Sequence, residues 1–296
     1  MLAIEEFLGV CLREIEHGDI HLGVTSLSEG LTEYRLKLSD SDWSTQVLAA
    51  CKNHPLATLL QEDPYTRRAI EKPRGYSGDA VMMDYVYFQK PPIDCSEQGK
   101  RIFLAVTASP NGASVRWRRE HIASLIDAEA LRRSNFSVLS VACGHCREYL
   151  LLKSETRNKL KRFLALDQDA ESINVISDNL NITPLCMSAK NLADDQSLQG
   201  FDLVYSAGLF DYLSDKSAIA LSNILLDRAA SGGTVLIANF TPDNWGRGYM
   251  DAFMNWQLIL RTKDDMRRLI PNARVASSYL YYDPYRNVIY LKMTKA

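Results

Sequence analysis

The order of hydrophobic and polar positions separates a helical first part of the chain from an alternating second part. Up to about residue 88, apolar residues recur at helical spacing, in one segment that ends at Gly18 and in another over residues 24–38. Ser41 is placed to cap a further helix, and residues 79–88 form the last helical pattern of this region. These patterns predict a helical N-terminal region.

A stretch rich in helix-breaking residues follows. Residues 88–100 contain two adjacent prolines and a glycine, which predict a linker. Residues 113–133 then carry apolar side chains on one helical face, which predicts an amphipathic helix leading into the second half. We therefore expect two domains, a helical cap over residues 1–98 and a second domain over residues 99–296.

From Phe136 onward, short apolar runs alternate with polar or helical stretches. Such alternation is typical of a parallel sheet covered by helices on both faces. The last two runs flank a turn that contains Asp283 and Pro284, so we expect an antiparallel hairpin at the end of the sheet. The expected strands cover residues 136–142, 162–167, 183–187, 201–207, 234–240, 273–283 and 287–295.

Composition places the chain among ordinary globular proteins. Its 296 residues are 46% hydrophobic and 24% charged, with a formal net charge of −2. That charge gives no global attraction to nucleic acid or to an acidic membrane, so we expect a small-molecule partner and no nucleic acid. The N-terminal segment carries Glu5 and Glu6 and lacks the features of a secretory signal, and no apolar run is long enough to span a bilayer. We expect a cytoplasmic protein with reduced cysteines, and the sequence leaves its oligomeric state open.

The segment "VLSVACGHCREYL" (138–150) contains two cysteines in a CxxC pattern, where the first expected strand runs into a turn. It could form a redox pair, half a metal site, or a loop that holds a ligand. Ligands of parallel sheets bind at the carboxyl ends of strands, where the strand order reverses. Gly144 would let the backbone approach a ligand closely. A helix expected from about Cys146 would aim its N–H groups at the ligand and lower the thiol pKa.

Two further strand ends support a ligand-binding loop. Asp167 ends the second expected strand and follows Gly144 by roughly the 20 residues that separate a glycine turn from a ribose-binding acid. The fourth expected strand runs into small residues, Ser206, Ala207 and Gly208, which leave room for a flat ligand.

The redox and zinc interpretations have less support. A thioredoxin-like site usually has an aromatic residue before its first cysteine, whereas this chain has Ala142 there. A zinc site needs four ligands, and Cys143, His145 and Cys146 have no second cluster elsewhere in the sequence. We therefore expect no metal site.

The strand-end signals together resemble the class I S-adenosylmethionine-dependent methyltransferases, which have a Rossmann-like α/β sheet. Of the glycines in that family's first motif, "ACGHC" keeps only Gly144, while Ala142 and Cys146 replace its neighbours. The resemblance implies S-adenosylmethionine as the cofactor. It also implies that the cofactor-binding residues are Ala142, Cys143, Gly144, His145, Asp167, Gln168, Ala189, Lys190, Ser206 and Ala207.

Three stretches resemble a narrower family, the bacterial extracellular-factor 3-hydroxypalmitic acid methyl ester biosynthesis proteins. They are "EDPYTRRAIEKPRGYSGDAVMMDYVY" (62–87), "SVACGHCRE" (140–148) and "NFTPDNWGRGYMDAFMNWQLILRT" (239–262). This resemblance implies O-methylation of a fatty-acid carboxylate. It also implies Tyr76, Asp79, Asp211 and Tyr212 as catalytic residues and Tyr85, Phe210, Asn239, Trp256 and Arg261 as substrate-binding residues.

Several of these residues have an equally simple structural interpretation. Asp79 could cap the helix that follows it rather than belong to a lid over the site. Trp256 could be a core residue, and Arg261 could be a solvated arginine rather than the partner of a substrate carboxylate. Most of the charges at Arg116, Arg118 and Arg119 would be solvated, although one could reach the donor's carboxylate.

Three functions remain open from the sequence. A carboxylate acceptor is already ionised at neutral pH and needs no general base. An amine or guanidino acceptor would need a carboxylate, for which Asp79 and Asp211 are available. The alternative of another class is a non-catalytic module that binds S-adenosylmethionine.

Overall fold

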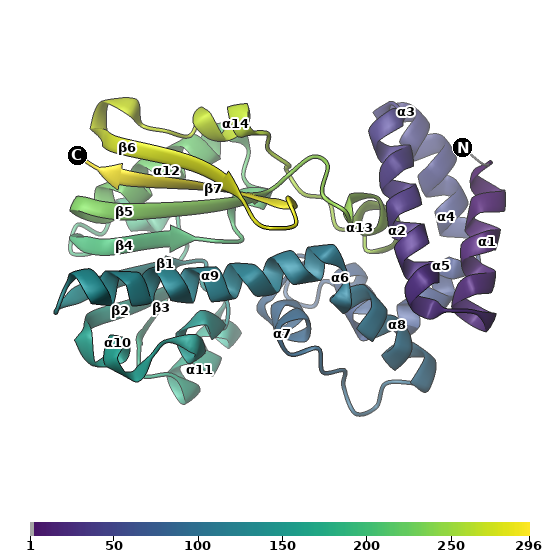
Figure 1. Ribbon diagram of the computed structural model, residues 1–296, viewed down its shortest axis with the longest axis horizontal. Coiled ribbons are helices and arrows are strands. Elements are labelled where there is room, and N and C mark those ends of the chain that lie inside the picture. Colours follow the sequence, from purple (N-terminus) through teal and green to yellow (C-terminus); the bar gives the residue numbers. More distant parts are fainter. Residues whose placement is uncertain (1–2) are drawn as a thin grey trace. The chain divides into compact units, whose positions relative to one another are not determined.

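The computed structural model describes residues 3–296 and divides the chain into two compact units (Figure 1). The first unit comprises the chain up to Arg116 together with Pro242–Gln257, and the second comprises Trp117–Thr241 together with Leu258–Ala296. The boundary expected after residue 98 falls inside the first unit. Its position differs because α8 (Glu97–Ala108) packs against α2 (Ile20–Lys37).

The first unit is helical, and local capping explains where its helices begin. The predicted end of the first helix at Gly18 is confirmed, and the carboxylate of Asp19 caps the next helix. Ser39, and not the predicted Ser41, caps the helix that follows, because its hydroxyl accepts the N–H of Asp42. The helices are α1 (Ile4–His17), α2, α3 (Asp40–Asp42), α4 (Ala49–Asn53), α5 (Leu56–Leu59), α6 (Pro64–Glu71), α7 (Ala80–Phe88), α8 and α13 (Arg247–Phe253).

The α13 segment belongs to the first unit although it lies between two strands in the sequence. The hydroxyl of Thr32 donates to the carbonyl of Trp245 and accepts the N–H of Gly248. Gly248 is required there, because a Cβ would lie 2.2 Å from the backbone of Leu31. The helical unit is therefore completed by residues far downstream, which the predicted division at residue 98 did not include.

The second unit is built on one seven-stranded sheet in the order β3-β2-β1-β4-β5-β7-β6. Strands β1 to β5 pair in parallel, and β7 is antiparallel to both β5 and β6. The predicted parallel sheet with a terminal antiparallel hairpin is thereby confirmed. The strands are β1 (Phe136–Val141), β2 (Leu160–Asp167), β3 (Thr183–Cys186), β4 (Phe201–Ser206), β5 (Ala229–Phe240), β6 (Val275–Tyr282) and β7 (Val288–Lys295).

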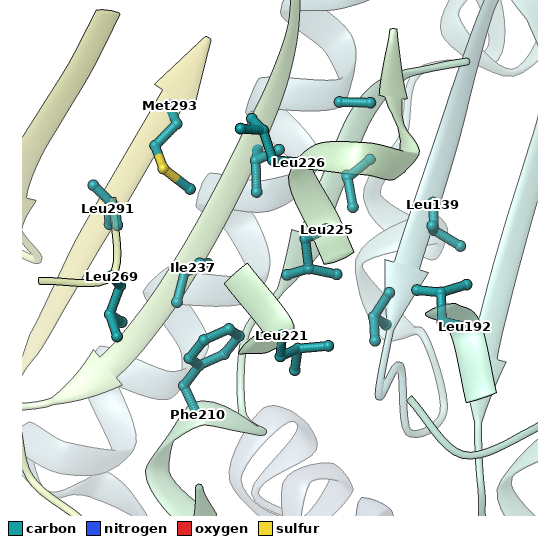
Figure 2. Packing of buried hydrophobic residues seen from close by; sticks show 14 of the residues in the cluster. Leu139, Leu192, Phe210, Leu221, Leu225, Leu226, Ile237, Leu269, Leu291 and Met293 are labelled. Carbon is teal, nitrogen blue, oxygen red and sulfur yellow. The ribbon is translucent and has the colours of Figure 1, made fainter. Parts of the chain in front are cut away.

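Helices cover the sheet, and side chains alternate between its two faces. On β7, Leu291 and Met293 pack in one large apolar cluster with Leu221 and Leu225 of α12, as Figure 2 shows. Tyr290 points to the opposite face, where it contacts His121. The helices of this unit are the remainder of α9 (Pro110–Arg132), α10 (Ser154–Lys159), α11 (Ala170–Asn179), α12 (Asp215–Arg228) and α14 (Lys263–Arg267).

Helix α9 agrees with the amphipathic helix predicted over residues 113–133, and its sequence continues from the first unit into the second. The residues predicted for its apolar face are buried or half-buried. Within residues 3–296, none of the helices is both long enough and apolar enough to cross a membrane.

Candidate functional site

The strand order reverses between β1 and β4, and in open α/β sheets ligands bind in the crevice that such a reversal opens at the carboxyl ends of the strands. Strand β1 continues into β2 and β3 on one side, and the chain then returns to form β4 on the other. The residues that end β1, β2 and β4 are Val141, Asp167 and Ser206. The predicted ligand loop therefore begins at the switch point of the sheet.

The loop that follows β1, residues Ala142–Cys146 (the β1 loop), has an unusual backbone. Ala142, Gly144 and Cys146 have φ angles of 55°, 53° and 50°. A positive φ is uncommon for residues other than glycine, and such residues concentrate at functional sites. These three positions are those at which the resembled family has its glycines. All three positions are thus left-handed, although only Gly144 is a glycine.

Hydrogen bonds connect this loop to the end of β2. The N–H of Cys143 donates to the carbonyl of Leu166 at 3.1 Å, and the N–H of Gly144 donates to Oδ2 of Asp167 at 2.8 Å. The other carboxylate oxygen of Asp167 accepts the N–H of Asp169 at 3.0 Å. Burial raises the pKa of Asp167, and these two N–H groups oppose that shift. The acid predicted to bind a ribose therefore also holds the β1 loop in place.

The prediction of a helix directly after the β1 loop is wrong. Residues Arg147–Leu151 form a single 3-10 turn, and the next helix, Ser154–Lys159, has only six residues. The thiol pKa values accordingly move opposite to the expectation, because burial raises the pKa of both Cys143 and Cys146 well above the usual range. Both thiols remain protonated at neutral pH.

The two cysteines are free thiols with different surroundings. The thiol of Cys143 donates to the carbonyl of Gly144, whereas that of Cys146 donates to Oε1 of Glu148, each at 3.6 Å. Within residues 3–296, no group of three or more histidine, cysteine, aspartate or glutamate residues could hold a metal ion.

The end of β4 provides the opposite wall of the crevice. Ser206 is buried, whereas Ala207 and Gly208 are half-buried, and a Cβ at Gly208 would meet only Nη1 of Arg118, at 3.9 Å. Arg118 itself is buried and donates to the carbonyl of Ala207 at 2.5 Å. The sequence analysis expected most of the charges at Arg116, Arg118 and Arg119 to be solvated. Arg118 is instead buried and fixes the loop after β4.

The remaining predicted cofactor residues lie beside the ends of β2 and β3. Gln168 and Lys190 are exposed, and Ala189 is half-buried against the core of the sheet. The N–H of Met187 donates to the carbonyl of Asp167 at 2.9 Å, which holds the β3 end against the β2 end. The predicted cofactor residues are thus gathered around neighbouring strand ends of one unit.

The predicted substrate residues of the same unit form a different arrangement. Arg261 is 1% exposed, and its Nη1 donates to the carbonyl of Phe210 and to Oδ1 of Asn239, both at 2.7 Å. Its Nη2 donates to the carbonyl of Leu213 at 2.6 Å and to Asp215 at 3.0 Å. The guanidinium fork predicted to bind a substrate carboxylate is therefore occupied by groups of the chain itself.

Asp211 and Asn239 complete this arrangement. Oδ1 of Asp211 accepts the N–H of Phe240 at 2.7 Å, and its carbonyl accepts the N–H of Ile259 at 2.7 Å. Burial raises the pKa of Asp211 to about 7. The amide of Asn239 donates to the carbonyls of Phe240 and Ile259. We call Phe210, Asp211, Leu213, Asn239 and Arg261 the Arg261 cluster, since their polar groups connect the loop after β4 to the segment after β5.

The two aromatic residues predicted beside Asp211 have opposite environments. Phe210 is fully buried and packs with Leu221 and Ile237 in the apolar cluster of the sheet (Figure 2). Tyr212 is 37% exposed. The structure thus makes Phe210 a core residue and leaves Tyr212 at the surface of the loop.

The other predicted residues belong to the helical unit. Asp79 is 1% exposed, caps α7 by accepting the N–H of Met82, and binds Arg68 through both carboxylate oxygens. Tyr85 packs edge-on against Phe103, and Trp256 packs in the same way against Tyr65. Tyr76 is half-buried. Asp79 therefore has the capping role that the sequence analysis weighed against a lid.

Sequence reasoning missed a buried polar group under the β1 loop. Oε1 of Glu148 accepts the hydroxyl of Tyr205, in the middle of the sheet, as well as the thiol of Cys146. The available signal was a tyrosine inside a parallel strand, because a buried phenol needs a hydrogen-bond partner. No pattern in the sequence indicates that Glu148 would be that partner.

Comparisons with known proteins agree with the fold. No protein-family model and no curated protein matches the chain. A possible exported protein from Bordetella parapertussis has a similar structure, with a TM-score of 0.66 and 17% identity over 93% of this chain and 95% of that one. A DUF574 family protein from Streptomyces avermitilis gives a TM-score of 0.55 and 13% identity over 73% and 97% of the two chains.

A third similar structure is that of an enzyme with a bound product. It is the magnesium protoporphyrin IX methyltransferase of Synechocystis PCC 6803 with S-adenosylhomocysteine, with a TM-score of 0.53 and 9% identity over 78% of this chain and 100% of that one. At such low identities these comparisons establish the fold alone, which is that of the Rossmann-like class I methyltransferases.

Proposed function

We propose that this chain is an S-adenosylmethionine-dependent methyltransferase that acts on a small molecule. The observation that carries the proposal is the β1 loop, with left-handed residues at three alternate positions, hydrogen-bonded to Asp167 at the switch point of the sheet. The left-handed β1 loop lies at the switch point of the sheet. It therefore supports donor binding more specifically than the overall fold does. The residues proposed to hold the donor are Ala142, Cys143, Gly144, His145, Asp167, Gln168, Ala189, Lys190, Ser206 and Ala207.

The chemistry of these residues fits the donor. A carboxylate such as Asp167 accepts hydrogen bonds from the hydroxyls of a ribose. The hydroxyl of Ser206 is buried and has no hydrogen-bond partner among residues 3–296, so a polar atom of a ligand would satisfy it. Ala142, Cys143 and Gly144 are half-buried and small, which leaves the loop backbone accessible.

The donor, when bound, supplies a methyl group on a positively charged sulfur. The chain must then hold the acceptor in line with that methyl and exclude water from it. We assign these tasks to Tyr212, on the loop after β4. A tyrosine suits them, because its ring shields a sulfonium and its hydroxyl orients a polar atom.

The finer proposal is O-methylation of a fatty-acid-like carboxylate, and the resemblance to the extracellular-factor family supports it. Such an acceptor is ionised at neutral pH and requires no base. Arg261 is not its anchor, because both terminal nitrogens of its guanidinium donate to groups of the chain itself. The amine alternative likewise loses Asp79, whose carboxylate is engaged by Arg68. A cytoplasmic location stays a prediction of the sequence.

Calorimetric titration with S-adenosylhomocysteine tests donor binding. The wild-type protein should bind, and Asp167→Ala should weaken binding by roughly 1.5–3 kcal/mol through loss of a charge-assisted hydrogen bond to the ribose. Asp169→Ala is the matched control, since Asp169 caps α11 and should affect stability rather than affinity. Equal affinity in wild type and Asp167→Ala would contradict the assignment.

Turnover tests the reaction class. Incubation with S-adenosylmethionine and a panel of fatty acids and amines should yield a product that carries one added methyl group by mass spectrometry. Donor binding without methylation of any small molecule in either class would favour the non-catalytic module over an enzyme.

A further inference from the structure

Next to the β1 loop, two buried polar side chains converge on the buried carboxyl group of a third residue. Oε1 of Glu148 accepts the hydroxyl of Tyr205 at 2.5 Å and the thiol of Cys146 at 3.6 Å. Their exposed fractions are 6%, 2% and 1% respectively. Water therefore has little access to this group, and each partner depends on the others for its hydrogen bonds.

The three residues come from the two walls of the crevice. Cys146 ends the β1 loop, Glu148 follows it in the 3-10 turn, and Tyr205 lies on β4 directly before Ser206 and Ala207. The carboxyl group of Glu148 thus connects the β1 loop to the strand that carries the opposite wall. The pairing between strands β1 and β4 ends at Ser140 and Tyr205. The β1 loop lies beyond this pairing, so another contact must connect it to β4.

The protonation states suit this connection. Burial raises the pKa of Cys146 and of Tyr205 well above their usual ranges, so both remain hydrogen-bond donors. Burial also raises the pKa of Glu148, whereas its hydrogen bonds and the nearby charge of Arg118 act in the opposite direction. Arg118 in turn holds the carbonyl of Ala207, so its position also affects the β4 wall.

The connection also explains why a cysteine replaces the third glycine of the motif. A side chain at a φ of 50° is strained, and glycine would relieve that strain. Glycine, however, could not donate a hydrogen bond to the buried carboxyl group of Glu148. The thiol of Cys146 supplies that donor, which gives the second cysteine of the CxxC pattern a role without redox chemistry or a metal.

We propose that Glu148, Tyr205 and Cys146 are positioning residues that fix the β1 loop against the β4 wall and thereby set the affinity for the methyl donor. The proposal rests on the proposed function. None of the three needs to touch the donor, because they act through the backbone of residues 142–146 and through Ser206 and Ala207. Disruption of the group should therefore weaken donor binding without removing any donor contact.

Titration with S-adenosylhomocysteine tests this in Tyr205→Phe. The substitution removes one hydroxyl donor and leaves the carboxyl group of Glu148 with the weak thiol of Cys146 and the backbone N–H of Glu148. We expect affinity to fall about tenfold, the scale of one lost buried hydrogen bond. Tyr149→Phe is the matched control, since Tyr149 is buried in the same 3-10 turn and donates at 3.1 Å to the carbonyl of Asn181, away from Glu148. Its affinity should equal that of the wild type.

A double variant distinguishes positioning from a general loss of stability. In Tyr205→Phe/Glu148→Met, both partners become apolar, which is often nearly neutral when a buried pair is replaced. Stability should recover, because no unpaired buried carboxyl remains, whereas affinity should stay about tenfold below that of wild type, because the hydrogen-bonded connection between the β1 loop and β4 is still absent. Reduced affinity in both Tyr205→Phe and the double variant supports the proposal, and recovery of affinity together with stability overturns it. Wild-type affinity in Tyr205→Phe overturns it.

Cysteine variants keep the proposal testable if Tyr205→Phe does not fold. Cys146→Ser retains a donor to Glu148 and should bind like the wild type, whereas Cys146→Ala should bind several-fold more weakly. Equal affinity in both overturns the proposal. If the wild type itself fails to bind S-adenosylhomocysteine, the proposed function fails and this inference with it; binding by the wild type with unaffected variants overturns this inference alone.

Discussion

The β1 loop and the Arg261 cluster both lie at carboxyl ends of strands, and both contain residues that the sequence analysis assigned to binding. In the β1 loop, half-buried small residues present their backbone, and the hydrogen bonds of Asp167 hold that backbone in shape. In the Arg261 cluster, the polar side chains are buried and bind carbonyl and N–H groups of the chain itself. The strand order therefore predicts where a binding site lies. The residue type alone does not predict which side chains face the ligand.

The physical reason is that buried polar groups must find partners. The carbonyls of Phe210 and Leu213 lie in a short irregular loop, where Phe210 also accepts the N–H of Leu213, and Arg261 supplies a donor to each of them. A guanidinium carries five N–H donors in a rigid plane, and Arg261 uses four hydrogen bonds to satisfy this loop and Asn239. An arginine after a strand is thus as well suited to holding a loop as to binding a carboxylate.

Replacement of Arg261 by alanine is expected to have the largest effect. It would leave Oδ1 of Asn239 and the carbonyls of Phe210 and Leu213 without these donors in a buried site. We expect the free energy of unfolding to fall by about 3–5 kcal/mol, as for removal of one partner of a buried charged group. Urea denaturation followed by circular dichroism measures the change.

The matched control for that experiment is Arg267→Ala. Arg267 forms an exposed ion pair with Asp264, so its loss should change stability by less than about 0.5 kcal/mol. If Arg261→Ala unfolded like the wild type and only raised the KM of a carboxylate acceptor, the cluster would be a substrate site after all.

Asp211 makes the stability of the Arg261 cluster depend on pH. Its pKa is raised to about 7 by burial, from an ordinary value of 3.8. Between these values the folded protein binds more protons than the unfolded chain, so this group lowers stability as pH rises from about 4 to about 7. Asp211→Asn retains an oxygen that accepts the N–H of Phe240 and removes the ionisation.

We therefore expect Asp211→Asn to gain stability relative to the wild type as pH rises, by on the order of 4 kcal/mol between pH 4 and pH 8. Thermal melts of both proteins across that range measure the difference. Asp63, whose pKa burial raises to about 6, contributes to both proteins and cancels in the comparison. A constant difference between the two proteins at all pH values would show that Asp211 is ionised in the fold without penalty.

Much of the fold could be predicted from the sequence, and the reasons are physical. The seven strands are short apolar runs bounded by turns, and buried parallel strands need no alternation to be recognised. The return of residues 242–257 to the helical unit depends on Thr32 and Gly248, which are distant in sequence. No local pattern indicates such a contact, so the domain boundary was misplaced.

The candidate site likewise has features that could be predicted from the sequence and features that could not. Gly144 and Asp167 could be predicted because their chemistry depends on strand order and spacing. The left-handed backbone of Ala142 and Cys146 could not, because neither residue favours that conformation. Likewise two of the four hydrogen-bond partners of Arg261 are backbone carbonyls, which carry no sequence signature. Long-range satisfaction of buried polar groups is what the sequence alone does not reveal.

Ala142→Gly tests the strain in the β1 loop. Glycine adopts a φ of 55° without the steric cost that alanine bears there, about 1–2 kcal/mol. Its greater freedom in the unfolded chain offsets about 0.4–1 kcal/mol of that gain. We expect a net stabilisation of about 0.5–1 kcal/mol with unchanged affinity for S-adenosylhomocysteine, from denaturation and calorimetry. The control Ala113→Gly, within α9, should instead destabilise by about 1 kcal/mol. Destabilisation by both variants would show that Ala142 is not strained.

The smallest expected effect concerns the thiols of the CxxC pattern. Cys146 is buried, Cys143 is half-buried, and burial raises the pKa of both, so little thiolate is present at neutral pH. Cys186 is exposed and provides an internal reference. Brief labelling with iodoacetamide at pH 7, followed by peptide mass spectrometry, should modify Cys186 first and the other two only after urea is added. Rapid labelling of Cys143 or Cys146 in the folded protein would mean that a thiolate forms there, and the redox interpretation of the pattern would regain its basis.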